Sequence, residues 1–250
     1  MAHLTELGLR LLPQRLDELL AQAEQHAWSH LELLDQVLAV PANERRERAL
    51  ARRLLGAKFR EEAATFEQFD WQFNPALDRV QLEALASGDF VRRRDNLIFI
   101  GQSGLGKSRL IQSIGRGCCV AGHRVRYTTS AELLRNLGAS LADGTTPKRL
   151  REYARFDLLI VDEFGFDKLE REQFPQAPSQ LYKLLDSRTR RASTAVVANI
   201  DFDAWGSYLG DAPLAMAFLD RLVDGAILLK FRGRSYRAHR AQPDRTRSQS

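Results

Sequence analysis

The stretch GQSGLGKS, residues 101–108, fits the phosphate-binding pattern G-x-x-x-x-G-K-[ST]. An apolar run, Asn96 to Ile100, precedes it, and a helical pattern from Lys107 to Val120 follows it. This order of strand, glycine-rich turn and helix is the context that a phosphate loop needs. Gly104 and Gly106 permit backbone angles closed to residues with side chains, so successive N–H groups can turn inward around a phosphate. The stretch therefore predicts a nucleotide-binding α/β fold.

Two side chains at the end of this loop carry the expected chemistry. The Lys107 ammonium is predicted to lie between the β- and γ-phosphates of ATP, and the Ser108 hydroxyl to bind Mg²⁺. The alternative is a plain glycine-rich turn, which leaves the Lys-Ser pair at this offset unexplained. We expect the nucleotide to be contacted by a continuous run of residues: Gly101, Gln102, Ser103, Gly104, Leu105, Gly106, Lys107, Ser108 and Arg109.

A pair of carboxylates follows the buried-strand pattern LLIVDEF, residues 158–164. Asp162 is predicted to hold Mg²⁺ through water, and Glu163 to polarise the water that attacks the γ-phosphate. The alternative is a pair of solvated loop carboxylates. An Asp-Glu pair that ends a buried strand downstream of a phosphate loop favours the catalytic interpretation.

Two further residues have weaker local patterns. Asn199 ends the apolar run before Asp201 and is positioned to orient the attacking water and sense the γ-phosphate. On pattern alone an ordinary turn Asn is favoured there. Arg221 lies near the end of a predicted helix and is either a surface residue or an arginine finger that reaches a neighbouring subunit's nucleotide.

Composition limits the class of protein. The chain has 250 residues, of which 44% are hydrophobic, enough for one large or two modest domains. It has no apolar run of the length that spans a membrane, and its N-terminus lacks a signal-peptide pattern, so we expect a cytoplasmic protein. Cys118 and Cys119 are adjacent on a predicted helix and the five histidines are scattered, which indicates buried thiols rather than a disulfide or a zinc site.

The net charge of +5 is concentrated in two stretches, the first of which runs from Glu44 to Arg60 and has seven basic residues, the last being Arg60, against two acidic ones. The second of these begins at Lys230 and has seven basic residues against Asp244 alone. For the first we predict contact with double-stranded DNA, and the alternative is a solvated helix face with pairs such as Glu44–Arg48. For the second, DNA contact and a solvated tail are equally favoured. The predicted DNA-contacting residues of the first stretch are Arg45, Arg46, Arg48, Arg52 and Arg53.

The first 90 residues are predicted to be helical. Leu4, Leu7 and Leu11 form one apolar face, and Pro13 opens a second helix. Ser29 and Glu32 form a capping box for a third helix, which Pro41 ends while starting a basic fourth helix. We place a boundary between Lys58 and Thr65. The predicted parts are a helical DNA- or partner-binding domain (1–60), a linker with a connecting helix (61–95), an ATPase core (96–238) and a disordered basic tail (239–250).

The linker contains an aromatic segment, TFEQFDWQFNP, residues 65–75. Its cluster of three Phe and one Trp is more often an interdomain plug than a platform for stacking bases. Asn74 and Pro75 are expected to be the N-cap and first residue of a helix that reaches about Ala86.

From Asn96 onward, short apolar runs alternate with helices, which predicts a parallel sheet with helices on both faces. The expected strands are Asn96–Ile100, Arg124–Thr128, Asp157–Val161, Thr194–Ala198 and Ala226–Phe231. Helices are expected to start at Lys107, Thr129, Pro147, Ser179, Asp201 and Pro213. Ligands of such sheets bind at the carboxyl ends of the strands.

Together the motifs GQSGLGKS, LLIVDEF, VVANIDFDAW and FLDRL…FRGRSYR resemble those of IstB-type transposition helper ATPases, which belong to the AAA+ superfamily and are related to DnaC helicase loaders. FDWQFNPALDR and the terminal G-x-S-Y-R, Gly233 to Arg237, are the most family-specific parts. GQSGLGKS departs from the Pro-rich loop that is usual in the family, but it keeps the lysine and the hydroxyl residue that contact phosphate and Mg²⁺. Residues 172–180, with two prolines, resemble a small insertion that obscures the start of the next helix.

The resemblance implies a fold and a function. It implies a five-stranded AAA+ core in which Lys107 and Ser108 bind phosphate and Mg²⁺, and in which Asp162 and Glu163 form the Walker B pair. By the same resemblance Asn199 is the sensor and Arg221 the trans-acting finger. Members of the family assemble on target DNA as homo-oligomers, bend the DNA and stimulate a partner transposase.

Three alternatives stay open. A helicase loader would share the ATPase core and differ in its partner. A small-molecule kinase would need an acceptor pocket and would have little use for Glu163 or a helical N-terminal extension. A nucleotide-gated binding module that never turns over is disfavoured by Glu163.

Overall fold

The computed structural model describes residues 13–61 and 64–236. Its contacts divide the chain into two compact units between Arg52 and Arg53, inside the helix α3. The two units are described separately below. The predicted boundary between Lys58 and Thr65 lies a few residues later and stays a prediction, while the predicted N-terminal leucine helix and the tail from 239 lie outside the described residues.

The first unit contains α2 (Pro13–Gln25) and the part of α3 (His30–Ala57) that reaches Arg52. The capping box at the start of α3 is confirmed: the Ser29 N–H donates to Glu32 Oε2 at 2.7 Å, and the Glu32 N–H donates to Ser29 Oγ at 3.3 Å. The predicted break at Pro41 is wrong, because α3 runs through it as one helix. A proline removes a single hydrogen bond, and the Ala, Arg, Glu and Leu residues after it are strong helix formers.

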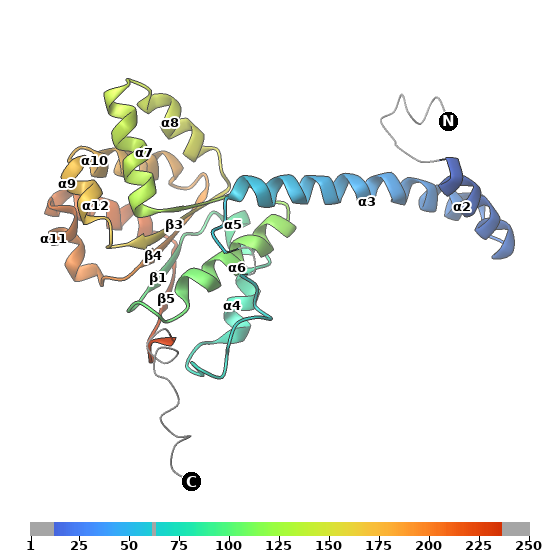
Figure 1. The fold of residues 1–250 in the computed structure, drawn as a ribbon, viewed down its shortest axis with the longest axis horizontal. Helices are drawn as coiled ribbons and strands as arrows, with labels where there is room; N and C mark the ends of the chain where they lie inside the picture. Colours follow the sequence, from blue (N-terminus) through green and yellow to red (C-terminus); the bar gives the residue numbers. More distant parts are fainter. Residues whose placement is uncertain (1–12, 62–63, 237–250) are drawn as a thin grey trace, which may run out of the picture. The chain divides into compact units, whose positions relative to one another are not determined.

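The second unit is built on a parallel five-stranded sheet (Figure 1). Its strands are β1 (Leu97–Ile100), β2 (Val125–Thr129), β3 (Leu158–Phe164), β4 (Ser193–Ala198) and β5 (Ile227–Lys230). They lie in the order β2-β3-β4-β1-β5, so the chain crosses from β1 to the far edge and returns. All five expected strands are confirmed to within a residue or two, except that β3 continues past Val161 to Phe164. This extension places both predicted carboxylates inside the strand.

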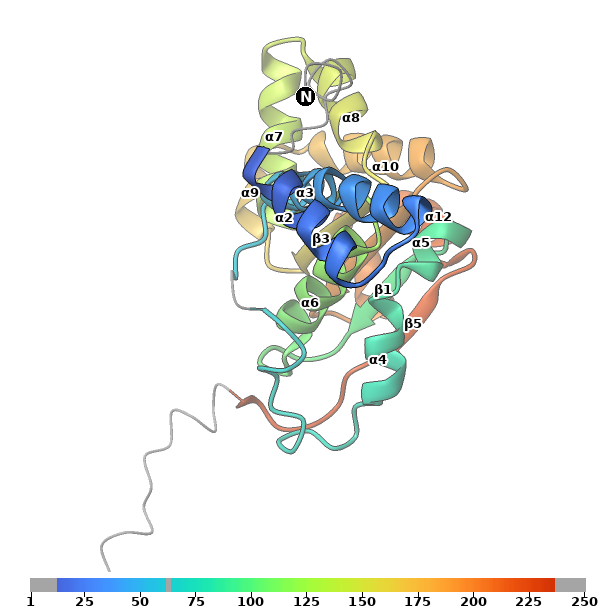
Figure 2. The same ribbon diagram turned by 90° about the vertical axis from the view of Figure 1, so that its right-hand side faces the viewer.

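Helices cover both faces of this sheet (Figures 1 and 2). One face carries α6 (Lys107–Val120), against which α4 (Arg79–Leu85) packs, with α5 (Asp89–Arg93) leading into β1. The other face carries α7 and α10 with their neighbours. The helices on that side are α7 (Ser130–Ala142), α8 (Thr146–Ala154), α9 (Lys168–Gln173), α10 (Ala177–Arg188), α11 (Trp205–Leu209) and α12 (Ala212–Val223), with a 3₁₀ turn at Phe202–Ala204.

Successive side chains of a strand point to opposite faces of the sheet, and here both sets are apolar, so both faces need helices to cover them. In β1, Ile98 and Ile100 belong to the large core cluster that includes α7, α10 and Trp205 of α11. A methyl group on Gly115 of α6 would lie 2.8 Å from Ile160 Cδ1 of β3, which shows how closely α6 packs on the opposite face. Strands buried on both faces are continuous apolar runs, as the sequence pattern indicated.

Several element boundaries differ from those expected. The helix expected at Pro75 begins at Arg79, because Asp78 caps it by accepting from the Gln81 N–H at 2.9 Å. Asn74 is instead buried and donates from Nδ2 to the Arg232 carbonyl at 3.1 Å. The helix expected near Ser179 begins at Ala177, with Pro178 in its first turn, where the missing N–H costs nothing. The Thr129 cap of α7 is confirmed.

Two expectations from composition can be compared with the structure. Among the described residues, no helix is both long and apolar enough to cross a membrane. Cys118 and Cys119 are free and buried, as expected, and burial raises the pKa of the Cys118 thiol to about 12 and that of Cys119 to about 11. The cytoplasmic location stays a prediction.

Candidate nucleotide-binding site

The phosphate loop joins β1 to α6 at the carboxyl edge of the sheet. Gly104 and Gly106 both have a φ of +84°, in the left-handed region that disfavours other residues. Space is limiting as well: a methyl group on Gly106 would lie 2.6 Å from the Phe69 ring, and one on Gly104 would clash with Ser235 Oγ. The loop therefore needs glycine at these two positions for its backbone angle and for the segments packed against it.

Lys107 is the first residue of α6, and its side chain turns back to the phosphate loop. Its side chain is buried, and Nζ donates to the carbonyl oxygens of Gly101 at 2.6 Å and Gln102 at 2.7 Å. Nζ also donates to Asn199 Oδ1 at 2.9 Å. Asn199 follows β4, which neighbours β1, so the sheet order brings this amide to the phosphate loop. The structure thus brings together two residues that the sequence indicated separately.

The two carboxylates at the end of β3 lie in a β-bulge. Val161 pairs with Val196 and Phe164 with Ala198, so two residues of β3 face one residue of β4. Glu163 takes a φ of +59°, a strained angle for a residue with a side chain. A bulge redirects side chains at the end of a strand. Here it accompanies one buried carboxylate, Asp162, and one half-exposed carboxylate, Glu163.

Asp162 is held by two hydrogen bonds. Its Oδ1 accepts from the Glu163 N–H at 2.7 Å, and its Oδ2 accepts from the Tyr127 hydroxyl at 2.8 Å. Burial, and then the nearby Asp162 charge, raise the pKa of Tyr127 far above its usual range, so the phenol remains a donor at neutral pH. Sequence reasoning missed this contact of Tyr127 with Asp162, because only the pairing of β2 with β3 reveals it.

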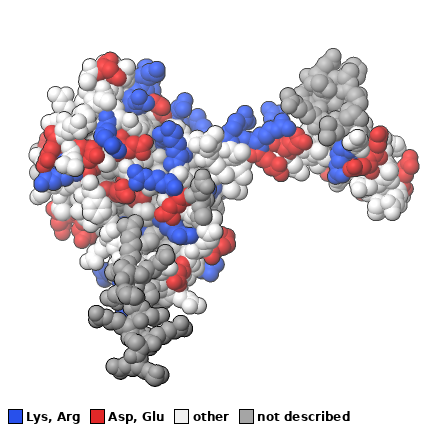
Figure 3. All heavy atoms as spheres, viewed as in Figure 1, with Lys and Arg blue, Asp and Glu red and all other residues white. Residues whose placement is uncertain are grey.

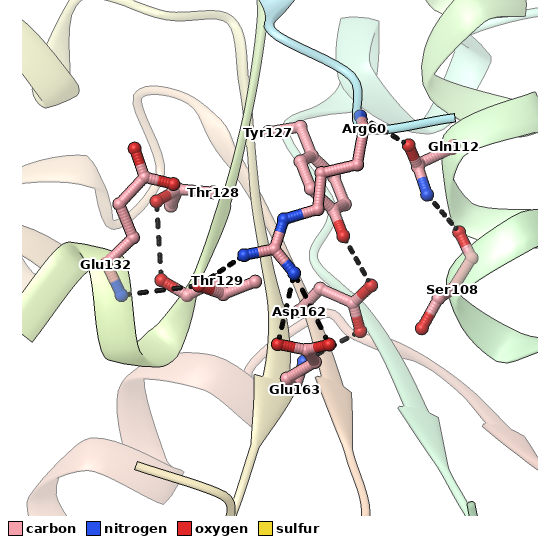
Figure 4. A network of polar contacts seen from close by, with 9 residues as sticks. All are labelled: Arg60, Ser108, Gln112, Tyr127, Thr128, Thr129, Glu132, Asp162 and Glu163. Atoms are coloured by element: carbon pink, nitrogen blue, oxygen red, sulfur yellow. Dashed lines mark hydrogen bonds and ion pairs between the residues drawn. The ribbon is translucent and has the colours of Figure 1, made fainter. Parts of the chain in front are cut away.

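The donor set fits a magnesium ion bound together with a nucleotide. The described residues contain no cluster of three or more His, Cys, Asp or Glu side chains that could hold a metal ion by themselves, so a metal here would also need ligands from the nucleotide and water. Figure 4 shows Ser108 from α6 alongside Asp162 and Glu163 from β3. A hydroxyl and a carboxylate are hard oxygen ligands, and Mg²⁺ usually takes its remaining ligands from water and phosphate.

A cavity of about 630 Å³ extends from the phosphate loop. Its lining includes loop residues 103–109 together with Glu163 and Asn199. It also includes three aromatic side chains, Phe69, Phe73 and Tyr236. The volume lies within the range of small-molecule sites, and the lining combines polar groups with aromatic surface.

Two segments that are distant in the sequence supply the aromatic side chains of the lining. The Tyr236 N–H donates to the Gly104 carbonyl at 2.9 Å, and the rings of Tyr236 and Phe73 meet edge to face with centroids 5.0 Å apart. The sequence interpretation of the aromatic segment as a plug between domains missed this role. The signal was the family-specific status of FDWQFNPALDR and G-x-S-Y-R, which the structure shows to be in contact through Phe73 and Tyr236.

Arg221 does not line this cavity. It lies near the end of α12, where Nε donates to Asp186 Oδ1 at 2.8 Å and Nη1 to Asp220 Oδ2 at 2.7 Å. The hydrogen bond that Arg221 donates to Asp186 raises the pKa of the guanidinium above its usual value. The structure therefore does not bring Arg221 to its own subunit's phosphate loop, and its role as a trans-acting finger stays a prediction.

The predicted DNA-contacting arginines lie on α3, whose acidic residues include Glu44 and Glu47. Basic and acidic side chains are both visible along this helix in Figure 3. The Glu44–Arg48 pair is present at 2.6 Å. Arg53 is partly buried, and its Nε donates to the Cys119 carbonyl at 2.8 Å in the second unit. Arg53 therefore has a structural contact, while the others are exposed to solvent.

The site combines a phosphate loop after β1, a carboxylate pair on β3 and an amide after β4 that contacts the loop lysine. With the strand order β2-β3-β4-β1-β5, these features define a P-loop ATP-binding core of the AAA+ type. The family model described as IstB-like ATP binding protein matches residues 2–243, so the chain belongs to that family.

Curated relatives agree. The chain is 33% identical over 234 residues to the insertion sequence IS21 putative ATP-binding protein of Pseudomonas aeruginosa. This alignment covers 94% of this chain and 86% of the relative. It is 29% identical over 231 residues to the insertion sequence IS5376 putative ATP-binding protein of Geobacillus stearothermophilus, with 92% and 90% covered. Both matches run through nearly the whole chain.

Solved structures share the fold. A structure of DnaI matches with a TM-score of 0.52 at 20% identity and covers 68% of this chain and 92% of that one. The replication initiator DnaA bound to AMPPCP and single-stranded DNA matches with a TM-score of 0.52 at 20% identity, covering 70% and 51%. At this identity the likeness concerns the fold alone.

Proposed function

We propose that the protein hydrolyses ATP with Mg²⁺ and acts as a DNA-dependent helper of a transposase. The observation that carries the enzymatic part is the single cavity that the phosphate loop, Glu163 and Asn199 line together. Hydrolysis needs a held γ-phosphate, a cation beside it and a group that polarises water. In this proposal those roles belong to Lys107, to Ser108 with Asp162, and to Glu163.

The cavity also accounts for the rest of the nucleotide. With the phosphates at residues 103–108, the base would lie against the aromatic side chains of the same cavity, because Phe69, Phe73 and Tyr236 offer flat apolar surfaces. Lys107 would exchange one or more of its present carbonyl contacts for phosphate oxygens while keeping Asn199 close. Bound Mg²⁺ would neutralise charge on the phosphates during transfer.

The transposition context comes from the relatives. Those matched along nearly their whole length are ATP-binding proteins of insertion sequences. These relatives favour a transposase as the partner. A replicative helicase, the partner of a helicase loader, is less well supported, because the likeness to DnaI concerns the fold alone. Double-stranded DNA is the proposed ligand of α3, whose exposed arginines suit phosphate contacts.

Glu163→Gln tests the enzymatic proposal. The amide keeps the shape of the side chain but cannot polarise water, so the variant should bind ATP like the parent and lose most turnover. Lys107→Ala should instead weaken binding itself. Hydrolysis by Glu163→Gln at the parental rate would show that the assigned role is wrong.

Arg221 is proposed to complete the site of a neighbouring subunit. Its position outside its own cavity supports this role. Arg221→Ala should then lose turnover while keeping ATP affinity, because the finger stabilises charge that develops on the γ-phosphoryl group. Mixing it with Lys107→Ala, which retains Arg221, should restore part of the activity on DNA. No recovery in mixtures that co-assemble would leave Arg221 as a structural residue of α12.

A further inference from the structure

Arg60 contacts the proposed water-polarising carboxylate from outside the sheet. Its Nη1 lies 3.4 Å from Glu163 Oε1 and 3.3 Å from Oε2, so one nitrogen donates to both oxygens. Its Nη2 donates to Thr129 Oγ1 at the end of β2 at 3.4 Å. Figure 4 shows the guanidinium between these two partners. The sequence interpretation had counted Arg60 only as one of the basic residues after Glu44.

The backbone of Arg60 and Glu61 is held by a hydrogen-bonded side chain of α6, the helix that follows the phosphate loop. Gln112 of α6 is buried, and its Oε1 accepts from the N–H groups of Arg60 at 2.9 Å and Glu61 at 3.0 Å. Its Nε2 donates to the Ser108 carbonyl at 3.0 Å. Residue 60 is thus tied to the turn of α6 that carries the predicted Mg²⁺ ligand.

These contacts occupy Glu163 in a way that opposes its proposed role. A carboxylate that polarises water must offer an oxygen lone pair to that water. Here both oxygens accept from a cation, which competes with the water for the same charge. The two side chains are 51% and 44% exposed, and half-exposed pairs at such distances are weak and exchangeable. The contact is therefore suited to being broken and remade.

We propose that Arg60 is a positioning residue that restrains Glu163, so that ATP hydrolysis proceeds mainly from molecules in which this pair is open. The inference rests on the proposed role of Glu163 and adds a residue to that reaction. Arg60 follows the end of α3, at Ala57, by three residues, so the restraint lies on the segment directly after the helix with the predicted DNA contacts.

The test is the steady-state ATPase rate of Arg60→Met without DNA. Methionine keeps an unbranched stem and removes the donors. We expect kcat to rise by up to about fivefold, the range of a half-exposed ion pair, with KM unchanged. The matched control is Arg116→Met: Arg116 also contacts this segment, through the Glu61 carbonyl at 2.7 Å and the Phe59 ring, and its loss should leave kcat unchanged.

Two comparisons separate this inference from the proposed function. In a Glu163→Gln background, Arg60→Met should produce no rise, because no carboxylate remains to release. If Glu163→Gln alone is inactive but Arg60→Met has a parental or lower kcat with normal ATP affinity, only the restraint is wrong. Arg60→Lys keeps the positive charge, on an ammonium group in place of the guanidinium, and should raise kcat by less than Arg60→Met does. Should Arg60→Met fail to fold, a parental or lower kcat in Arg60→Lys overturns the restraint.

Discussion

The phosphate loop and the two segments that cover it line one cavity, yet they follow from the sequence in different ways. The loop is contiguous, and its positions are decided by backbone angles and short-range contacts. The covering segments meet through Asn74 and Arg232, which are 158 positions apart. Phosphate chemistry is thus encoded locally, whereas the proposed site for the base depends on tertiary contacts between distant segments.

The largest effect should come from breaking the loop. Lys107→Ala removes the ammonium that should contact the phosphates, and charged hydrogen bonds contribute about 2–3 kcal/mol, so ATP affinity should fall by roughly 30-fold or more. Titration with a fluorescent ATP analogue measures this change. Lys148→Ala, an exposed lysine of α8, is the matched control. Parental affinity in Lys107→Ala would show that the loop is not the phosphate site.

The covering segments should contribute less and act on the base. Phe69→Ala and Tyr236→Ala should weaken ATP binding by about 1–2 kcal/mol, roughly 5- to 30-fold, because the base has less aromatic surface to stack on. Binding of inorganic tripolyphosphate should be unchanged, since it lacks a base. Phe66→Ala is the control, because Phe66 stacks on Trp71 and does not line the cavity. Equal losses for ATP and tripolyphosphate would contradict a base site at these aromatic side chains.

Neither region is expected to carry the affinity for DNA, which we assign to α3. Reversing the charges of Arg45, Arg46, Arg48 and Arg52 should lower duplex affinity and reduce the slope of log affinity against log salt by about 0.9 for each DNA phosphate that the protein no longer neutralises. Arg53 is left intact because it holds the Cys119 carbonyl. Reversal of Arg149 on α8 is the control. An unchanged slope would place the DNA site elsewhere, with residues 92–94 next to test.

The smallest effect concerns the helix behind the loop. Cys118 and Cys119 have pKa values raised by burial, to about 12 and about 11, so thiolate is scarce below these values. Alkylation of the native protein should be slow at pH 8 and should keep rising with pH up to about 11, the pKa of Cys119. Phe69→Ala should leave this protection intact, since Phe69 packs on Gly106, at the opposite end of α6 from the two thiols. Fast native labelling at pH 8 would show that α6 opens.

The limits of sequence reasoning are physical. The strands and most helix caps were predictable, because apolar runs and side-chain oxygens at helix starts act over a few residues. The continuation of α3 through Pro41 was not, since the loss of one hydrogen bond does not stop a helix of strong formers. Of the site, the Lys107–Asn199 contact follows from the sheet order, whereas Tyr127 and Arg60 required the strand pairing and the path of the chain after α3.

The most direct test of the proposed function is the ATPase rate of the full chain with and without duplex DNA. The account predicts measurable Mg²⁺-dependent hydrolysis that rises when duplex DNA is added and that is lost in Glu163→Gln under both conditions. A rate that duplex DNA leaves unchanged, at concentrations where binding is demonstrated, would contradict a DNA-dependent helper and favour a P-loop enzyme that acts on a small molecule.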